Sequence, residues 1–515
     1  MSASNPWSAS LVDRARRWAD EDPDPATRAE TERMLEAHDA DGLQRSFGGR
    51  LQFGTAGLRG ELGPGPNHMN RALVRRAAAG LAHYLGPGSR VVVGYDARHM
   101  SAEFATDSAA VFAGAGLDAV LLPRPLPTPV LAFTVRHLRG DAGVMVTASH
   151  NPARDNGYKV YLGDGAQIIP PADADISRAI DGITTLSRVP LDDGFTVAGD
   201  SVVDAYLDAI GGVIPAVGPR GVRIVYTAMH GVGAAVAEQA FARAGFGDVH
   251  PVAAQEHPDP DFPTVSFPNP EEPGALDLAF AEAERTGADI ILANDPDADR
   301  LAVAVGGTKL TGDQVGCLIA DYLLRQPNPG GATRLVVSSI VSSTLLGRIA
   351  ADYGARYERT LTGFKWIVRP ALAHPNWQFV LGYEEALGYS VHGIVHDKDG
   401  ISAALVVAEL AAELKQQGLT LEDRLDELDR RYGRYRTAQR AFRLPSDEQQ
   451  AAMVRVRAQP GAREVGPDVV EVGGEGWRVI FRPSGTEPKL KVYAEAVDGD
   501  VDAVVARAAE WAGLA

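Results

Sequence analysis

The sequence is poor in cysteine, in long apolar runs and in positive charge, and each shortage excludes a class of protein. It has one cysteine, Cys317, among 515 residues, so a framework of disulfides within the chain is excluded and a reducing compartment is allowed. No run is long and apolar enough to cross a bilayer, and the polar, acidic N-terminus through Asp24 lacks the apolar core of a signal peptide. We therefore expect a cytoplasmic protein with no membrane partner.

Positive charge is also in short supply. The 50 lysines and arginines stand against 67 aspartates and glutamates, for a formal net charge of −17. This balance disfavours nucleic acid or an anionic membrane surface as a partner. An anionic small molecule would have to be attracted by basic residues gathered at one site.

The alternation of strand-like and helix-like segments predicts an α/β architecture. Strand-like 91–93, helix-like 101–113 and the strand-like runs 119–122 and 143–146 repeat the β-α-β pattern of a parallel sheet. The chain is longer than a single hydrophobic core usually supports, so several domains are expected. Changes of pattern and a turn-rich stretch at 325–331 divide the chain into α/β domains at 1–211, 212–322 and 323–437 and a smaller α+β domain at 438–515.

Ser149 stands in the hexapeptide Thr-Ala-Ser-His-Asn-Pro at 147–152, directly after the apolar run 143–146. The apolar run is typical of a central strand, and Asn151-Pro152 turns the chain out of it. Ser149 is therefore expected at the mouth of a buried strand, where α/β sheets present catalytic groups. Taken alone, such a hexapeptide is more often an ordinary loop with a solvated serine.

A short loop between two strand-like runs holds three aspartates: Asp295, Asp297 and Asp299. Their alternation points them at one centre, and oxygen ligands with no histidine or cysteine nearby favour one Mg²⁺ over zinc. A calcium EF-hand is excluded by pattern, because Arg300 occupies the place of the turn glycine and Gly306 that of the bidentate glutamate. An acidic solvated turn stays the alternative. Arg300 beside the carboxylates indicates an anionic, phosphoryl-bearing ligand.

Two further segments combine glycine with hydroxyl and basic residues. The segment 482–489, Arg-Pro-Ser-Gly-Thr-Glu-Pro-Lys, follows the strand-like run 477–481. Its glycine and small hydroxyl residues let backbone N–H groups converge on a phosphate, and its basic ends supply charge. The segment 53–60, Phe-Gly-Thr-Ala-Gly-Leu-Arg-Gly, has a similar composition, but by itself it is better explained as a glycine-rich turn.

In this order the four motifs resemble those of the α-D-phosphohexomutase superfamily, the phosphoglucomutases and phosphomannomutases, over nearly the whole chain. Segments 155–161, 362–366 and 397–400, together with 53–60, resemble the phosphoglucomutase-2/phosphopentomutase branch. The resemblance implies three similar mixed or parallel-sheet α/β domains and a smaller α+β C-terminal domain around a central cleft. It also implies a sugar-phosphate substrate and a monomer or small homo-oligomer.

The resemblance assigns roles to individual residues. Ser149 would carry a phosphoryl group, pass it to a sugar phosphate and recover the other phosphoryl group from the resulting sugar bisphosphate, which would also act as activator. One Mg²⁺ would bind Ser149, Asp295, Asp297 and Asp299. The other catalytic candidates are Arg59, His150, Lys159, Arg300 and Lys398. Substrate would be bound by Thr362, Gly363, Lys365, Glu384 and Glu385, and its distant phosphate by Arg482, Ser484, Gly485, Thr486 and Lys489.

The sugar-recognition segment 382–389 departs from many hexose enzymes. Ala386 stands where those enzymes have serine, and Phe364 stands where the bacterial phosphomannomutase/phosphoglucomutase branch has histidine. Alanine cannot hydrogen-bond a ring hydroxyl, so pentose phosphates become compatible beside glucose phosphates. Phosphomannomutase specificity and a sugar-bisphosphate synthase stay as alternatives. A non-catalytic sugar-phosphate binder is disfavoured, because every motif position is filled.

Overall fold

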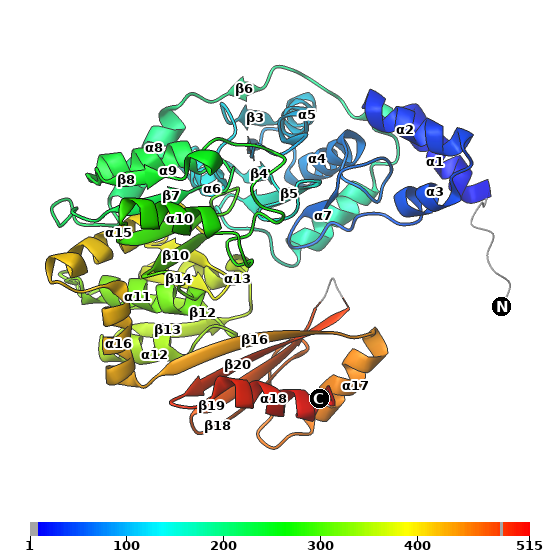
Figure 1. Ribbon diagram of the computed structural model, residues 1–515. Helices are drawn as coiled ribbons and strands as arrows, with labels where there is room; N and C mark the ends of the chain where they lie inside the picture. Colours follow the sequence, from blue (N-terminus) through cyan, green and yellow to red (C-terminus); the bar gives the residue numbers. More distant parts are fainter. Residues whose placement is uncertain (1–8, 485–487, 515) are drawn as a thin grey trace. The chain divides into compact units, whose positions relative to one another are not determined.

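The computed structural model describes residues 9–484 and 488–514, which belong to two compact units (Figure 1). Unit 1 comprises Met1–Ala302 and Ile394–Ala408, and unit 2 comprises Val303–Gly393 and Glu409–Ala515. The division between the units falls inside one strand, Leu301–Val305, and inside one helix, Gly400–Gln416. Gly485 and Thr486, two of the predicted phosphate-binding residues, lie outside the described residues.

Helices and strands are interspersed along the chain from the N-terminus to β10, which contains the division at Ala302. They are α1 (Ala9–Glu21), α2 (Pro25–Glu36), α3 (Ala40–Phe47), β1 (Leu58–Glu61), α4 (Arg71–Leu85), β2 (Arg90–Tyr95), α5 (Ser101–Gly114), β3 (Asp118–Leu121), α6 (Thr128–His137), β4 (Ala142–Val146), β5 (Asp155–Leu162), α7 (Ala172–Asp181), η1 (Leu186–Arg188), β6 (Thr196–Val197), α8 (Ser201–Gly211), β7 (Ile224–Thr227), α9 (Ala234–Ala244), β8 (Val249–Pro251), η2 (Ala253–Gln255), α10 (Asp277–Thr286), β9 (Ile290–Asn294) and β10 (Leu301–Val305).

The remaining elements run from β11 to the C-terminal helix α18. They are β11 (Thr308–Lys309), α11 (Gly312–Arg325), β12 (Arg334–Ser339), α12 (Leu345–Asp352), β13 (Arg356–Thr360), α13 (Phe364–Ile367), α14 (Arg369–Ala373), β14 (Gln378–Glu384), β15 (Gly388–Val391), α15 (Gly400–Gln416), α16 (Leu421–Tyr432), β16 (Tyr435–Arg443), α17 (Ser446–Arg457), β17 (Arg463–Gly466), β18 (Val469–Gly474), β19 (Trp477–Pro483), β20 (Lys489–Val497) and α18 (Val501–Ala512).

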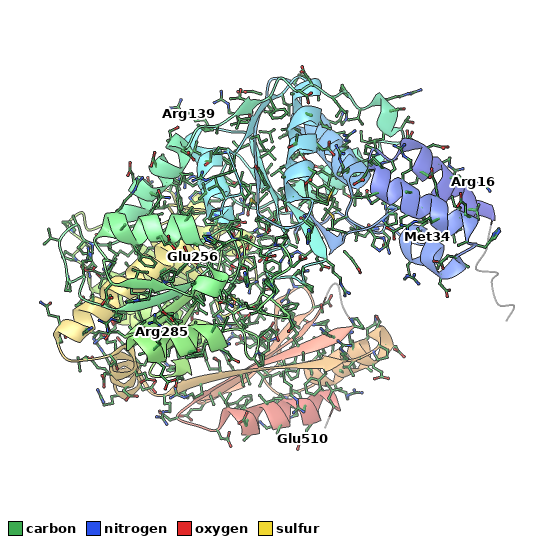
Figure 2. The ribbon with its side chains drawn as sticks, turned by 45° about the horizontal axis from the view of Figure 1, so that its top comes forward. Arg16, Met34, Arg139, Glu256, Arg285 and Glu510 are labelled. Atoms are coloured by element: carbon green, nitrogen blue, oxygen red, sulfur yellow. The ribbon has the colours of Figure 1, made fainter. Side chains whose placement is uncertain are left out.

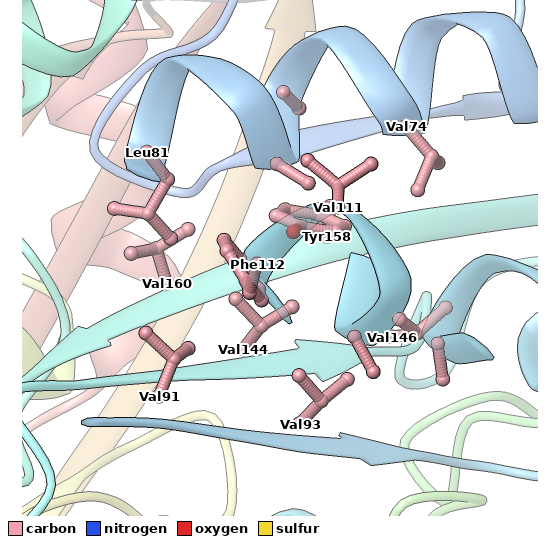
Figure 3. Packing of buried hydrophobic residues seen from close by; sticks show 14 of the residues in the cluster. Val74, Leu81, Val91, Val93, Val111, Phe112, Val144, Val146, Tyr158 and Val160 are labelled. Carbon is pink, nitrogen blue, oxygen red and sulfur yellow. The ribbon is translucent and has the colours of Figure 1, made fainter. Parts of the chain in front are cut away.

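The first sheet has the strand order β1-β5-β4-β2-β3-β6. Strand β2 pairs in parallel with β3 and β4, whereas β5 runs antiparallel to both β4 and β1. Valines of β2 and β4 meet side chains of α4 and α5, including Leu81 and Phe112, in the core drawn in Figure 3. All five residues of β4 are buried, which explains why its sequence is an unbroken apolar run. The strand that leads to Ser149 is therefore a fixed element of the core.

A small helical cap precedes this sheet. The helices α1, α2 and α3 enclose their own apolar cluster, in which Met34 lies with Leu11 and Leu43. Arg16, on α1, is exposed to solvent (Figure 2). These helices therefore serve as packing elements.

The second sheet has the strand order β11-β10-β9-β7-β8, with β7 parallel to β8 and β9. Every residue of β9 is buried, and so is every residue of β10. Two buried strands thus bracket the aspartate loop on both sides, which limits how far that loop can shift.

Unit 2 contains two sheets. The first has the order β13-β12-β14-β15, with β12 parallel to β13 and β14. The second, with the order β16-β20-β19-β18-β17, is antiparallel throughout, and its core includes residues of α17 and α18. The predicted fold class is confirmed: three mixed sheets with helices and a smaller antiparallel sheet with helices at the C-terminus.

Cys317 is buried in α11. Within residues 9–484 and 488–514, none of the helices combines the length and the apolar character that crossing a bilayer requires. One feature is unexpected: residues 394–408, inside the predicted segment 323–437, belong to unit 1.

Candidate active site

Ser149 lies in the loop that follows β4, and its surroundings fix the direction of its hydroxyl. Its backbone is in the left-handed region with φ 52°, an uncommon conformation for a residue with a side chain. Its N–H donates to Thr147 Oγ1 over 2.9 Å. Its Oγ donates to Asp295 Oδ2 over 2.9 Å and lies 3.1 Å from His150 Nδ1. The serine therefore faces the aspartate loop.

Asp295, Asp297 and Asp299 lie together, each offering a carboxylate oxygen within 4.8 Å of the others, and all three are fully buried. Lys159 Nζ donates to Asp297 Oδ2 over 2.7 Å and to Asp299 Oδ2 over 2.9 Å. Among the residues that the structure describes, Oδ1 of Asp297 and Oδ1 of Asp299 accept no hydrogen bond although both are buried. Such oxygens need a partner, and a metal ion fits them.

The charges within this cluster are unequal. Burial, together with the charges of Asp297 and Asp299, raises the pKa of Asp295 well above its usual value. Burial alone would also raise the pKa of Asp297, but the charge and hydrogen bond of Lys159 outweigh it and hold that pKa below the usual range. Negative charge is therefore stabilised beside the lysine and opposed beside Ser149, where a cation would relieve it.

Lys398 reaches the cluster from the segment 396–400. Its Nζ lies 3.3 Å from Asp299 Oδ2 and 3.6 Å from Asp397 Oδ1. Asp397 Oδ2 accepts hydrogen bonds of 2.7 Å from Tyr161 and from Gln167, which hold the segment in unit 1. A Cβ at Gly400 would lie 2.2 Å from the carbonyl oxygen of Arg300, so only glycine allows this close approach to the aspartate loop.

Three other candidates surround Ser149. Burial, with the charges of Arg300 and Arg59, holds the pKa of His150 well below its usual value, so the imidazole is neutral at neutral pH. Arg59 donates to Asn151 Oδ1 over 3.2 Å. The backbone N–H of Arg300 donates to Asp295 Oδ1 over 3.0 Å, and its guanidinium lies 3.4 Å from Glu271. Lys159, in contrast, contacts the aspartates.

The remaining candidates lie in unit 2. Glu385 Oε2 accepts hydrogen bonds from Ser339 Oγ over 3.0 Å and from Ser342 Oγ over 3.3 Å. Burial, with the charges of Glu384 and Asp313, raises the pKa of Glu385 to about 7. Thr362, Gly363 and Lys365 lie at and just before the start of α13.

Arg482 lies on β19 and hydrogen-bonds Tyr493 of β20. Ser484 N–H donates to the Lys489 carbonyl over 2.8 Å, which brings both ends of the predicted phosphate loop together. Unit 1 thus gathers Ser149, the three aspartates and the basic catalytic candidates, and unit 2 carries the sugar and phosphate candidates.

Sequence reasoning missed Arg98, which is buried behind the loop that carries Ser149. Its NH2 donates over 2.6 Å to the carbonyl oxygens of Ser149 and Asn151, and its NH1 donates to those of Pro152 and Asp155 over 2.8 and 3.2 Å. The position of Arg98 just after β2 could have revealed its role. Strands β2 and β4 are parallel neighbours, so the loops that follow them meet at one sheet edge.

We predict that Arg98→Met loosens the loop that carries Ser149. Removing the guanidinium frees four carbonyl groups and leaves Asp96, 3.4 Å away, as an uncompensated buried charge, at a cost of about 3 kcal/mol of unfolding free energy. Hydrogen–deuterium exchange should show faster exchange in residues 147–155. Arg90→Met is the matched control, because Arg90 lies on the same strand in an exposed ion pair with Asp118. Unchanged exchange at 147–155 in Arg98→Met would contradict this role.

Comparison with known proteins identifies the family. Profiles of the phosphoglucomutase/phosphomannomutase family match as α/β/α domain I at residues 50–187, domain II at 204–308, domain III at 311–432 and the C-terminal domain at 442–510. A Haemophilus influenzae protein named "Probable phosphomannomutase" is 46% identical over 461 residues, 83% of this chain and 93% of that protein. The human phosphopentomutase is 33% identical over 562 residues, 95% of this chain and 91% of that protein. A phosphoglucomutase/phosphomannomutase family protein from Burkholderia thailandensis shares the fold, with a TM-score of 0.72 and 22% identity over 90% of this chain and 97% of that chain. The chain therefore belongs to the phosphoglucomutase/phosphomannomutase family, within the α-D-phosphohexomutase superfamily and its phosphoglucomutase-2/phosphopentomutase branch.

Proposed function

We propose that this phosphosugar mutase moves a phosphoryl group between the 1-position and the 6- or 5-position of glucose and pentose phosphates, through phosphorylated Ser149 and a sugar bisphosphate. The observation that carries the proposal is the 2.9 Å contact from Ser149 Oγ to Asp295 Oδ2, at the edge of a buried carboxylate cluster. A serine that faces such a cluster is placed for phosphoryl transfer rather than for solvation.

A covalent phosphoenzyme suits this reaction because the two sugar oxygens are too far apart to share one site. A free sugar hydroxyl would attack the phosphorus on Ser149, so that a bond to the sugar oxygen forms and the bond to Oγ breaks. Lys398 is the proposed proton-transfer group for the hydroxyl. Arg59, Arg300, neutral His150 and Lys159 would surround the transferred group or its carboxylate neighbours.

Asp295, Asp297, Asp299 and Ser149 would hold one Mg²⁺. The fit rests on the two buried Oδ1 atoms that accept no hydrogen bond from the described residues and on a donor set made of oxygen alone. When bound, the ion would withdraw charge from the phosphoryl oxygens.

Arg482, Ser484 and Lys489, together with Gly485 and Thr486, are the proposed binders of the phosphate that does not react. Thr362, Gly363, Lys365, Glu384 and Glu385 are the proposed sugar-binding residues. Holding the far end of the sugar would orient the reacting end. Because the bisphosphate presents a phosphate at either end, the same residues would serve both orientations.

The sugar class is argued from Ala386 and from the relatives. An alanine removes one hydroxyl-binding group, which favours tolerance of pentose phosphates. The human relative is named a phosphopentomutase, which agrees with that choice. Phosphomannomutase specificity is the second candidate, because the Haemophilus influenzae relative carries that name.

The proposal also covers organisation. It includes domain boundaries near residues 211, 322 and 437. It also includes a cytoplasmic location, a monomeric or small homo-oligomeric state, the absence of nucleic-acid partners and activation by sugar bisphosphate. Each sheet lies mainly in one of the four proposed segments, which supports those boundaries.

We expect Ser149→Ala to abolish turnover while leaving the fold intact, because the phosphoryl carrier is lost. Intact-protein mass spectrometry should find one phosphoryl group on the active wild-type protein and none at this position in the variant. Ser201→Ala, an exposed serine of unit 1, is the control and should keep wild-type turnover. Full activity of Ser149→Ala would refute the phosphoserine.

Removing the metal should cause a large and reversible loss of turnover. Chelation is expected to lower turnover by at least about 100-fold, since charge on the phosphoryl oxygens is no longer neutralised. Added Mg²⁺ should restore turnover and should raise the melting temperature, because an ion that binds the folded protein stabilises it. Undiminished turnover after exhaustive chelation would count against the site.

Sugar choice can be measured on a panel of glucose-, mannose-, ribose- and deoxyribose-1-phosphate. We expect turnover of glucose and pentose phosphates, and we expect Ala386→Ser to shift kcat/KM toward glucose by about 10-fold, the value of one neutral hydrogen bond. A clear preference for mannose-1-phosphate would favour the second candidate. Glucose-1,6-bisphosphate that accumulates, rather than activating turnover in small amounts, would indicate the synthase alternative.

A further inference from the structure

The loop from Ser339 to Thr344, here called the serine loop, connects β12 to α12 and contacts a predicted sugar-binding residue. Ser339 and Ser342 both donate hydrogen bonds to Glu385 Oε2, and the Glu385 N–H donates to Ser342 Oγ over 3.1 Å. Both serines are fully buried, and their hydroxyls lie 2.8 Å apart. The position of the Glu385 carboxylate therefore depends on where this loop lies.

The serine loop is held from the C-terminal sheet. Arg478 of β19 donates to the Ile340 carbonyl over 2.7 Å and also to the Ser342 carbonyl. Glu495 of β20 accepts the Thr344 N–H over 2.8 Å and the Thr344 hydroxyl. Arg478 and Glu495 are themselves paired across the strands, with Nε 3.0 Å from Oε1. A buried ion pair of the C-terminal sheet thus hydrogen-bonds both ends of the serine loop, which follows a strand of another sheet.

The same sheet face continues toward the predicted phosphate clamp. Arg478, Ile480 and Arg482 alternate along β19 and therefore share one face. Ile480 packs with Ile340 and Val341 of the serine loop in one apolar cluster. Neighbouring residues of one short strand consequently contact the loop that positions Glu385 and carry the phosphate-binding arginine.

We infer that Arg478 is a positioning residue for sugar recognition: it acts through the serine loop on Glu385 and couples the phosphate-binding sheet to the sugar carboxylate. This inference rests on the proposed function, because it takes Glu385 to bind the sugar. Ser342 is the link, since its carbonyl accepts from Arg478 and its hydroxyl contacts Glu385. Arg478 itself touches no substrate in this scheme, and it is nine-tenths buried.

The test is a double-mutant cycle on kcat/KM for glucose-1-phosphate with Arg478→Met and Glu385→Gln. If Arg478 acts through Glu385, each single variant should have a kcat/KM about 30-fold lower than the wild type, and the double variant should have one no more than about 100-fold lower. Independent roles would multiply to about 1,000-fold, and that result would overturn the inference. Arg440→Met is the matched control, because Arg440 is an exposed arginine on β16 of the same sheet, and it should keep wild-type kinetics.

A second cycle decides the matter if Arg478→Met does not fold. Ser342→Ala removes the hydroxyl that contacts Glu385 but keeps the carbonyl that Arg478 binds. The folded variant should therefore have a lower kcat/KM and a modestly lower melting temperature, and its loss of kcat/KM should not add to that of Glu385→Gln. Additive losses in this cycle would also overturn the inference. If Glu385→Gln alone had wild-type kcat/KM, the sugar-binding role of Glu385 in the proposed function would be wrong, an outcome distinct from additivity.

Discussion

The crowding of three buried carboxylates at one point is the constraint on which the site depends. Two unit charges 4.8 Å apart repel by about 3 kcal/mol at the effective dielectric of a protein interior, and three such pairs form here. Lys159 and Lys398 lie close enough to compensate two of the negative charges. Asp295, which contacts Ser149, has a raised pKa because of this crowding, and a cation at that place would stabilise its charged form.

The fold resists this repulsion by fixing backbone as well as side chains. The aspartate loop joins two strands that are buried along their whole lengths, so it cannot spread without exposing them. Opposite it, Ser149 keeps an uncommon left-handed backbone while Arg98 binds the carbonyls around it. Backbone strain of this kind persists only where surrounding contacts over-determine it. The serine hydroxyl is consequently preorganised toward the carboxylates.

Much of this arrangement could be predicted from local pattern. The apolar run before Ser149 and the alternation of Asp295, Asp297 and Asp299 are short-range signals, and the structure has the expected strand and cluster there. Arg98 and the serine loop could not be found in that way, because their partners are largely backbone carbonyls or residues distant in the chain, which leave no pattern. The placement of residues 394–408 with unit 1 depends on contacts such as Tyr161 with Asp397, which lie 236 residues apart. The predicted roles of the site residues stay predictions.

The distribution of basic residues explains how a chain of net charge −17 could still receive an anion. Lys159 and Lys398 contact carboxylates, so neighbouring carboxylates compensate most of their positive charge. Arg59, in contrast, is exposed and donates to the neutral amide of Asn151, in the loop that carries Ser149. A guanidinium at this position would suit a phosphoryl group. The lysines would thus stabilise the carboxylates that carry a metal, whereas the arginine would draw the substrate to them.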